Sequence, residues 1–280
     1  MKSISLKTIL FLSYFFISLS LATAQNLVVT NTNDSGPGSL REAIELANLN
    51  PDPANISFNI AGASPISIKP LTPYDSIVYS TVIEGESIGK EIIIDGSLID
   101  KVVFWNASCF KLEATTDPAL FEIKKLKIVN FDYGVGGSGF KKYLLHESEL
   151  PGAGISLGED SLIVENCRFI NALGSGISLD SRGGLYGIAI IANNIISNSS
   201  GNGVYVDEAG FELVIIKDNI ISSNAQNGID FFDIGGKVHI LNNQIYDNTR
   251  NGIWYEMTDE VLIKGNSIGY DPIANVIKPN

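Results

Sequence analysis

The chain has 280 residues, of which 45% are hydrophobic and 18% are charged, and its formal net charge is −12. This composition is too apolar for a disordered chain, and the negative charge disfavours binding to nucleic acid or to anionic membranes. Ile, Val, Asn, Gly and Ser are abundant, which indicates β structure. We therefore expect a β-rich protein with one large domain or two small ones.

The first residues have the pattern of a secretory signal peptide. Lys2 and Lys7 make a basic start, the apolar stretch ILFLSYFFISLSLA follows, and small residues (ATA) occupy positions 22–24. The apolar stretch is short for a membrane span and ends in a cleavage-like sequence, so the pattern predicts removal of residues 1–24 and export rather than membrane insertion. Cleavage would remove two lysines and no acidic residue, which changes the formal charge from −12 to −14.

Residues 25–62 are predicted to form an N-terminal cap. The sequence NLVVTNTNDSGPGSLREAIELAN gives a strand, a turn rich in Gly and Pro, and a helix, before a further strand. Ser39 and Glu42 have the spacing of a capping box. The apolar residues of the helix fall on one face, and they are Leu40, Ala43, Ile44 and Ala47. We expect this helix to cover the core of the domain that follows; a helix that binds a partner is the alternative.

Residues 63–280 alternate short apolar runs with polar turns. STVIEG, EIIIDGS, KVVFWNAS, CFKLEA and LFEIKKLKIVNF, between residues 80 and 131, are predicted strands. In the last of these, Ile123, Leu126 and Ile128 have a spacing that recurs downstream. Residues 136–153, GGSGFKKYLLHESELPGA, interrupt the rhythm, so an insertion loop or short lid is predicted there.

A repeat of about 25 residues follows. Four segments share one 14-residue frame: VENCRFINALGSGI, IANNIISNSSGNGV, IKDNIISSNAQNGI and ILNNQIYDNTRNGI, which start at Val164, Ile191, Ile216 and Ile240, and a fifth copy begins at Ile263. Each copy contains short alternating runs and has no room for a helix, so its strands must stack in parallel in rungs about 4.8 Å apart. The repeat therefore predicts an all-β fold, a parallel β-helix.

The repeated asparagines are predicted to stack inside this solenoid. The first ladder comprises Asn194, Asn219, Asn243 and Asn266, and the second comprises Asn224 and Asn248 after Ser199. A buried amide that bonds the coils above and below satisfies backbone groups that would otherwise be unpaired. A calcium or sugar site made by these amides is the alternative. In the copy from Val164 the same positions hold Cys167 and Ala172, so the amide stack should begin after that copy.

The two cysteines, Cys109 and Cys167, are too few for a disulfide scaffold, and Cys167 should be a free buried thiol. His146 and His239 are the only histidines, and no Cys/His cluster has zinc spacing. The sequence therefore predicts no cofactor, although calcium bound by carboxylates is open.

Positions two and four residues after each repeated glycine are predicted to point outward. Flat rings stack on sugars and carboxylates accept hydrogen bonds from hydroxyl groups. The predicted polysaccharide-binding residues are Tyr205, Asp207, Asp230, Phe232, Trp254 and Glu256. An ordinary solvated surface is the alternative.

The catalytic candidates are Asp207, Asp230 and Glu256. Diagonal neighbours on adjacent rungs should lie roughly 8 Å apart, which is within the ~6.5–9.5 Å range of inverting glycosidases.

With these motifs laid out, the chain resembles exported bacterial right-handed parallel β-helix proteins. The likeness lies in VTNTNDSGPGSLREAI at residues 29–44 and in the coil pattern NxIxxNxxxGI. The resemblance implies the fold but not one function, because such coils occur in pectin-acting enzymes, alginate epimerases, tailspikes and adhesins. The polygalacturonase-type motifs NTD, DD, GHG and RIK are absent. A lyase would need an Arg or Lys base, for which Arg182 and Arg250 are conceivable.

The sequence thus favours an exported or surface β-helix module that binds polysaccharide or mediates adhesion without catalysis. The first alternative is a carbohydrate-active enzyme (a lyase, hydrolase or epimerase), and the second is a structural spacer in a larger surface protein. In similar proteins the phrase NxIGxD is followed by further coils, whereas here the chain ends at VIKPN. We therefore expect further chain, another domain or another subunit at this end.

Overall fold

The computed structural model describes residues 24–87, 89–115, 119–152, 154–158, 161–180, 187–207, 210–258 and 260–280. The predicted signal peptide lies outside the described residues, apart from Ala24. Within the described part of the chain, no helix has both the length and the apolar character needed to cross a membrane.

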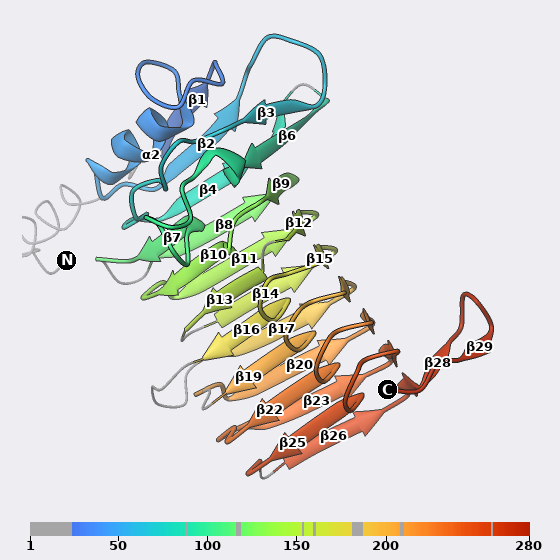
Figure 1. The fold of residues 1–280 in the computed structure, drawn as a ribbon. Helices are drawn as coiled ribbons and strands as arrows, with labels where there is room; N and C mark the ends of the chain where they lie inside the picture. The colour runs from blue at the N-terminus through green and yellow to red at the C-terminus, as the bar shows by residue number, and fades with distance from the viewer. Residues whose placement is uncertain are drawn as a thin grey trace, which may run out of the picture.

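The chain winds into a solenoid with three long parallel sheets (Figure 1). Sheet A comprises β1 (Gln25–Val29), β2 (Ala54–Phe58), β4 (Thr81–Glu84), β8 (Leu120–Lys124), β11 (Lys142–His146), β14 (Ser161–Glu165), β17 (Ile188–Ala192), β20 (Leu213–Lys217), β23 (Lys237–Leu241) and β26 (Glu260–Lys264). Sheet B comprises β3 (Ile66–Ile68), β6 (Lys90–Asp95), β9 (Leu126–Val129), β12 (Glu149–Pro151), β15 (Arg168–Ile170), β18 (Ile195–Ser197), β21 (Ile220–Ser222), β24 (Gln244–Tyr246) and β27 (Ser267–Ile268).

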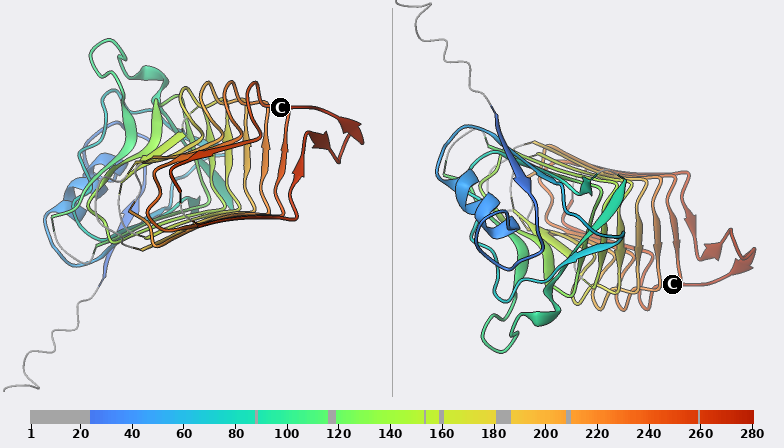
Figure 2. Two further views of the ribbon diagram at one scale, coloured as in Figure 1. Left: turned by 90° about the horizontal axis from the view of Figure 1, so that it is seen from below. Right: turned by 90° about the horizontal axis from the view of Figure 1, so that it is seen from above.

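Sheet C comprises β7 (Ser108–Glu113), β10 (Tyr133–Ser138), β13 (Gly154–Leu157), β16 (Ile177–Asp180), β19 (Val204–Asp207), β22 (Ile229–Phe232) and β25 (Ile253–Glu256). From β4 to β25 each coil supplies one strand to each sheet, and the C-terminal coils stack as evenly spaced rungs (Figure 2). The predicted all-β fold, a parallel β-helix, is confirmed. The remaining short strands are β5 (Glu86–Ser87), paired with β6, and the hairpin of β28 (Tyr270–Asp271) and β29 (Val276–Ile277).

Alternating side chains explain why these strands close around a core. In β19 and β22, for example, Val204, Val206, Ile229 and Phe231 are buried, while their neighbours in sequence face outward. The pairing register keeps like positions in line from coil to coil, so the inward side chains form one continuous hydrophobic core. Such burial is the main source of stability for stacked coils.

The N-terminal end of the solenoid is covered by α2 (Leu40–Asn48), which packs beside β1 and β2 (Figures 1 and 2). The hydroxyl of Ser39 accepts a hydrogen bond from the N–H of Glu42 at 3.1 Å, and the Glu42 carboxylate accepts one from the N–H of Gly38. The first bond satisfies an N–H group that the first helical turn leaves without a partner, and the second fixes the chain just before the N-cap residue. The buried face of the helix comprises Leu40, Ala43, Ile44 and Ala47.

Asparagine side chains form a buried ladder at the turn between sheets A and B. The Oδ1 atom of Asn219 accepts hydrogen bonds from the backbone N–H and the side-chain amide of Asn194, at 2.9 and 3.0 Å. The Asn219 amide donates to Asn243 and to the carbonyl of Ile191, both at 2.9 Å. The same pattern continues to Asn266, and Cys167 donates its N–H to Asn194, so the amide stack begins after the coil of Cys167.

A second ladder runs along the turn that follows sheet B. Asn224 accepts from the N–H of Ser199 at 3.0 Å, and Asn248 accepts from the N–H of Asn224 at 3.1 Å. Asn280 takes the next position, because its Oδ1 accepts from the Asn248 amide at 2.7 Å after the β28–β29 hairpin has left the coil. The hydroxyl of Ser199 is buried and has no hydrogen-bond partner in the described structure.

Other asparagines have a backbone role that the sequence analysis missed. The residue before each first-ladder position adopts a left-handed conformation, with φ of 55° at Asn166 and 56° at Asn193. Asn and Asp tolerate this conformation better than other residues with a Cβ.

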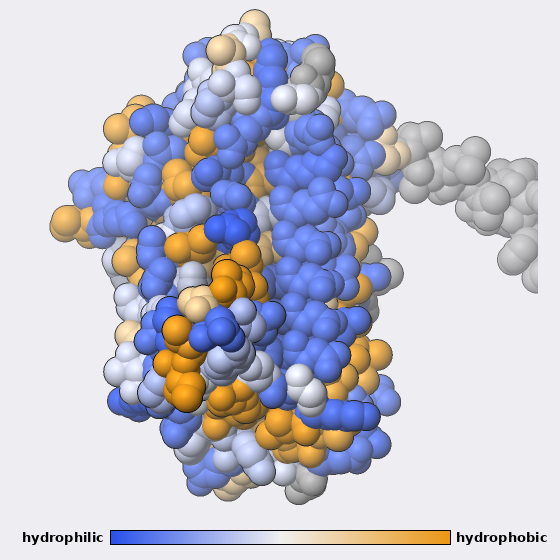
Figure 3. All heavy atoms as spheres, turned by 90° about the vertical axis from the view of Figure 1, so that its right-hand side faces the viewer, coloured by the Kyte–Doolittle hydropathy of each residue, from blue (hydrophilic) through white to orange (hydrophobic). Residues whose placement is uncertain are grey.

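On the side where β9, β12 and β15 are labelled in Figure 1, a continuous hydrophilic band runs along the solenoid (Figure 3).

The predicted insertion loop at 136–153 is wrong for the described residues 136–152. They contain the end of β10, all of β11 and β12, and thus a regular coil. Leu145, Ser148 and Leu150 occupy the same slots as Val164, Cys167 and Phe169 in the next coil. The repeat was hidden because Ser148 replaces the ladder asparagine and because this coil reaches its glycine three residues earlier than the later ones.

The predicted strand KVVFWNAS is also wrong over most of its length. Residues 101–106 form turns between β6 and β7, and only Ser108 belongs to a strand. Val102 is 91% exposed and Trp105 is 76% exposed. The apolar composition of this segment predicts a core strand, whereas only Phe104 and Ala107 pack against the core and the other large apolar side chains are exposed.

Candidate functional site

The outer face of sheet C brings the predicted binding residues together. Tyr205, Asp230 and Trp254 are paired across β19, β22 and β25, so they lie in line on successive rungs. Asp207, Phe232 and Glu256 form the neighbouring line, two residues further along the same strands. The alternation of inward and outward side chains, read from the repeat, is what places both lines on the surface.

Five of these six residues line one open hollow of about 540 Å³. Its lining comprises Ser175, Asn202, Tyr205, Asp207, Gln226, Asp230, Phe232 and Trp254. We call this the acidic hollow. Glu256 lies outside its lining, next to Phe232 on the exposed strand β25. The hollow therefore combines three aromatic rings with two carboxylates and two amides.

Asp230 is the most perturbed acid of this hollow. It is 8% exposed, and its Oδ2 accepts a hydrogen bond from the Asn227 amide at 2.7 Å. Burial raises the pKa of Asp230; hydrogen bonds from Asn227 and Asn202 oppose this, the charge of Asp207 adds to it, and the net direction is upward. The two carboxylates thus have different environments, since Asp207 accepts a hydrogen bond from the Tyr205 hydroxyl at 2.7 Å.

A third row of amides supports Asp230, and the sequence analysis did not identify it. Asn227 donates its N–H to Asn202 at 2.9 Å, and Asn251 donates its N–H to Asn227 at 3.0 Å. These residues, with Ser175, each precede the repeated glycine, so the recurring Asn-Gly pair was the available signal. The row fixes the amide that holds Asp230 and contributes Asn202 to the lining of the hollow.

A second hollow of about 490 Å³ lies near the N-terminal end of the same sheet. Its aromatic wall comprises Tyr74, Phe104, Trp105 and Tyr133, and its floor includes Lys111, Gly136 and Ser156 of sheet C. We call this the aromatic hollow. The sequence does not reveal this hollow, because the apolar composition of residues 101–106 predicts a strand and the composition of residues 136–153 predicts a loop.

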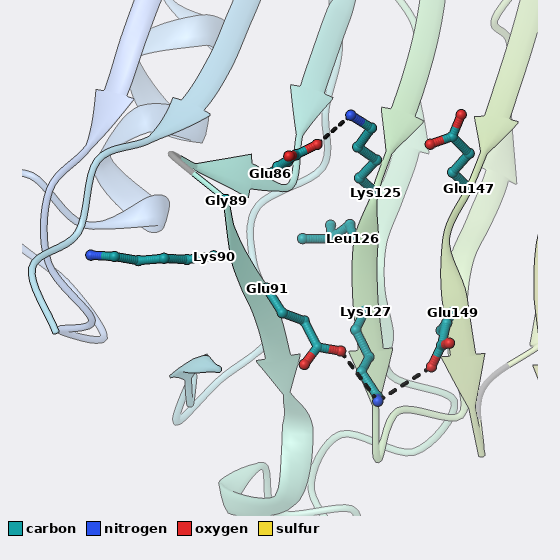
Figure 4. A pocket seen from close by; sticks show the side chains of 9 residues that line it. All are labelled: Glu86, Gly89, Lys90, Glu91, Lys125, Leu126, Lys127, Glu147 and Glu149. Atoms are coloured by element: carbon teal, nitrogen blue, oxygen red, sulfur yellow. Dashed lines mark hydrogen bonds and ion pairs between the residues drawn. The ribbon is translucent and has the colours of Figure 1, made fainter. Parts of the chain in front are cut away.

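A third hollow of about 290 Å³ lies over the edge of sheet B, and charged side chains line it (Figure 4). Lys127 lies between two carboxylates, 3.4 Å from Glu91 and 3.2 Å from Glu149, and Lys125 is paired with Glu86. Lys125 and Lys127 are thus paired with carboxylates of neighbouring rungs, whereas Lys90 donates to the carbonyl of Ile60 at 2.9 Å. Exposed pairs of this kind contribute little stability, and the lining contains no aromatic ring.

The remaining candidate groups do not form a metal or redox site in the described residues. No cluster of three or more His, Cys, Asp or Glu side chains there could hold a metal ion. Both cysteines are free and buried, and burial raises the pKa of Cys167 to about 12. Arg182, one of the two arginines considered as a base, lies outside the described residues. Arg250 acts on Asp230 through its charge and is not part of the lining that the structure describes for the acidic hollow.

Comparison with known proteins agrees with the fold. Residues 153–271 match the family model described as "Right handed beta helix region". This match agrees with the parallel β-helix fold, and the matched segment includes the coils that carry the acidic hollow. A search of curated proteins returned no match.

Two solved structures from Azotobacter vinelandii have distant similarity. The A-module of mannuronan C-5 epimerase AlgE6 is 13% identical, with a TM-score of 0.36 over 86% of this chain and 87% of that one. The A-module of mannuronan C-5 epimerase AlgE4 is 12% identical, with a TM-score of 0.40 over 85% of this chain and 92% of that one. These values are too low to transfer an activity, so function must be argued from the residues of this chain.

Proposed function

We propose that this protein is an exported polysaccharide-binding module and that the acidic hollow of sheet C is its binding site. The observation that supports this most is the gathering of Tyr205, Phe232 and Trp254 around Asp207 and Asp230 in one hollow. Aromatic rings offer flat apolar faces to sugar rings, and carboxylates and amides bond hydroxyl groups. Export rests on the signal-peptide pattern of residues 1–24.

The preorganisation of the polar groups favours binding. The Tyr205 hydroxyl is held by Asp207, and Asp230 is held by Asn227, which is itself anchored in the third amide row. Side chains that are already fixed lose little conformational freedom when a ligand binds. Trp254 is 37% exposed, so part of its ring is open to a ligand.

The test is affinity electrophoresis of the exported chain in gels that contain a panel of neutral, amino-sugar and uronate polysaccharides. Retardation by at least one polysaccharide is expected. The double variant Tyr205→Ala, Trp254→Ala should lose about tenfold or more in affinity, or about 1.4 kcal/mol, since it removes two of the three rings of the hollow. Tyr270→Ala, on the β28–β29 hairpin, is the matched control and should behave like the wild type. If no polysaccharide retards the wild type, this proposal is wrong.

Cleavage of a glycosidic bond is a second candidate, favoured by the raised pKa of Asp230 beside Asp207. A carboxyl group whose pKa is raised can remain protonated and act as a general acid, while an ionised neighbour activates water. The Asp230→Asn variant should then lose roughly 10²–10⁴-fold in the release of reducing ends while it retains binding. If wild type and variant both bind and neither releases reducing ends or an unsaturated product, the module is not catalytic toward that polysaccharide.

A further inference from the structure

One line of outward positions crosses all seven strands of sheet C. The pairing register aligns Lys111, Gly136, Ser156, Ser178, Tyr205, Asp230 and Trp254. Rungs in a parallel sheet are about 4.8 Å apart, so the six steps of this line span about 29 Å along the axis of the solenoid. We call this line the sheet C row.

The two hollows lie on this row and nearly meet. Lys111, Gly136 and Ser156 belong to the floor of the aromatic hollow. The next position is Ser178, and the acidic hollow begins one rung later at Tyr205. The side chains in the middle of the row are therefore small, so no bulky residue of the row separates the hollows.

We propose that the two hollows form one continuous track for an extended linear polysaccharide that lies along the axis of the solenoid. This inference rests on the proposed function and extends it. A sugar unit in an extended chain is about 5 Å long, roughly one rung, so the track accommodates about six units. Trp105 stands at one end and Trp254 at the other, and each offers a ring for stacking.

The charges of the track restrict the class of ligand. Asp207 and Asp230 line the acidic hollow, and none of its described lining residues is a lysine or an arginine. At the far end Lys111 is paired with Glu113 at 2.5 Å, which offsets its charge. A polyuronate would place carboxylates beside carboxylates, and like charges at short range repel. The ligand is therefore an uncharged or amino-sugar chain.

The first experiment measures chain-length dependence by calorimetry. The probes are trimers and hexamers of β-1,4-glucan, β-1,3-glucan, β-1,4-mannan and chitosan, with hexagalacturonate and hexamannuronate as the anionic arm. At least one uncharged or amino-sugar hexamer should bind about tenfold or more tightly than its trimer, because a longer chain engages both hollows at once. Both uronate hexamers should bind more weakly than that hexamer.

The second experiment blocks the track between the hollows. Ser178→Leu places a bulky side chain on the intervening rung, and it should reduce the affinity for the hexamer to about that for the trimer while trimer binding is retained. Ser197→Leu, in β18 on sheet B, is the matched control because Ser178 and Ser197 are both partly exposed strand serines. Trp105→Ala should also weaken hexamer binding alone, whereas the neighbouring surface change Val102→Ala should not.

The outcomes separate this inference from the proposed function. Equal affinities for trimer and hexamer, or a Ser178→Leu variant that binds the hexamer like the wild type, would overturn the continuous track and leave the acidic hollow as a short site. Tighter binding of a uronate hexamer would overturn the ligand class. If no probe binds at all, both the proposed function and the track are wrong.

Discussion

The coils from β14 to β27 and the coils from β2 to β13 follow the same path with different interiors. In the first group, which we call the regular half, asparagines fill the first-ladder slots from Asn194 onward. In the irregular half the corresponding slots hold Leu126 and Ser148, although the Ser148 hydroxyl still accepts the N–H of Leu126 at 3.3 Å. The path of a coil thus depends on its inward apolar positions, and the ladder residue can vary.

The irregular half compensates with aromatic packing. Phe121 packs near Phe110 and Phe140, with ring centroids 6.0 and 6.1 Å away, respectively. The sheet A position that holds Phe121 holds Val214 and Val238 in the regular half, because the pairing register carries it from strand to strand. Larger rings in one half therefore take the place of stacked aliphatic chains and amides in the other.

The largest expected effect is from truncating this aromatic cluster. Phe121→Ala should lower the free energy of unfolding by about 3–5 kcal/mol, because a fully buried ring leaves a cavity. Val214→Ala, at the equivalent position of the regular half, removes far less volume and should cost about 1–2 kcal/mol. Urea unfolding followed by circular dichroism measures both. Equal losses would mean that the buried rings stabilise the irregular half no more than aliphatic side chains stabilise the regular half.

A smaller difference is expected between the two kinds of ladder residue. Asn219→Ala removes a side chain that is 1% exposed and makes hydrogen bonds to both neighbouring coils. Since it leaves a backbone N–H and a carbonyl unpaired, it should lower the free energy of unfolding by about 2–4 kcal/mol. Ser148→Ala leaves only the N–H of Leu126 unpaired and should cost about 1–2 kcal/mol. The same unfolding experiment decides the comparison, and a cost for Ser148→Ala that matches Asn219→Ala would contradict it.

The sequence could predict the regular half and its hollow because side-chain identity there repeats with the register. Once Gly203, Gly228 and Gly252 were aligned, the outward positions of three strands followed, and Tyr205, Asp230 and Trp254 could be placed in line. The repeat could not be used to locate the aromatic hollow, because the coil around Ser148 is shortened and Trp105 lies in a turn segment. Periodicity cannot show where a turn segment such as 101–106 lies against a sheet.

The smallest expected effect concerns two buried carboxylates with opposite pKa shifts, one in each half. Burial acts to raise the pKa of Asp95 in the irregular half, but hydrogen bonds from Asn130, from the N–H of Ser97 and from Lys69 outweigh it, and the pKa is lowered. Asn130 donates at 2.7 Å and Lys69 lies 3.1 Å away. Asp230 in the regular half is shifted upward, because burial prevails over its amide partners.

These directions give opposite dependences of stability on pH. A lowered pKa means that the folded state favours the charged form, so the contribution of Asp95 is present above the ordinary value of 3.8 and is lost as the pH falls through its folded pKa. A raised pKa means that the folded state favours the neutral form, so the contribution of Asp230 is present below pH 3.8 and is lost as the pH rises through its folded pKa.

Asp95→Asn should therefore destabilise the protein at pH 7 and have little effect well below pH 3.8. Asp230→Asn, which mimics the neutral acid, should instead stabilise it at pH 7 and approach the wild type in acid. Urea midpoints of both variants and the wild type between pH 2 and pH 7 measure this. Curves that change in the same direction for both variants would show that burial does not dominate at Asp230.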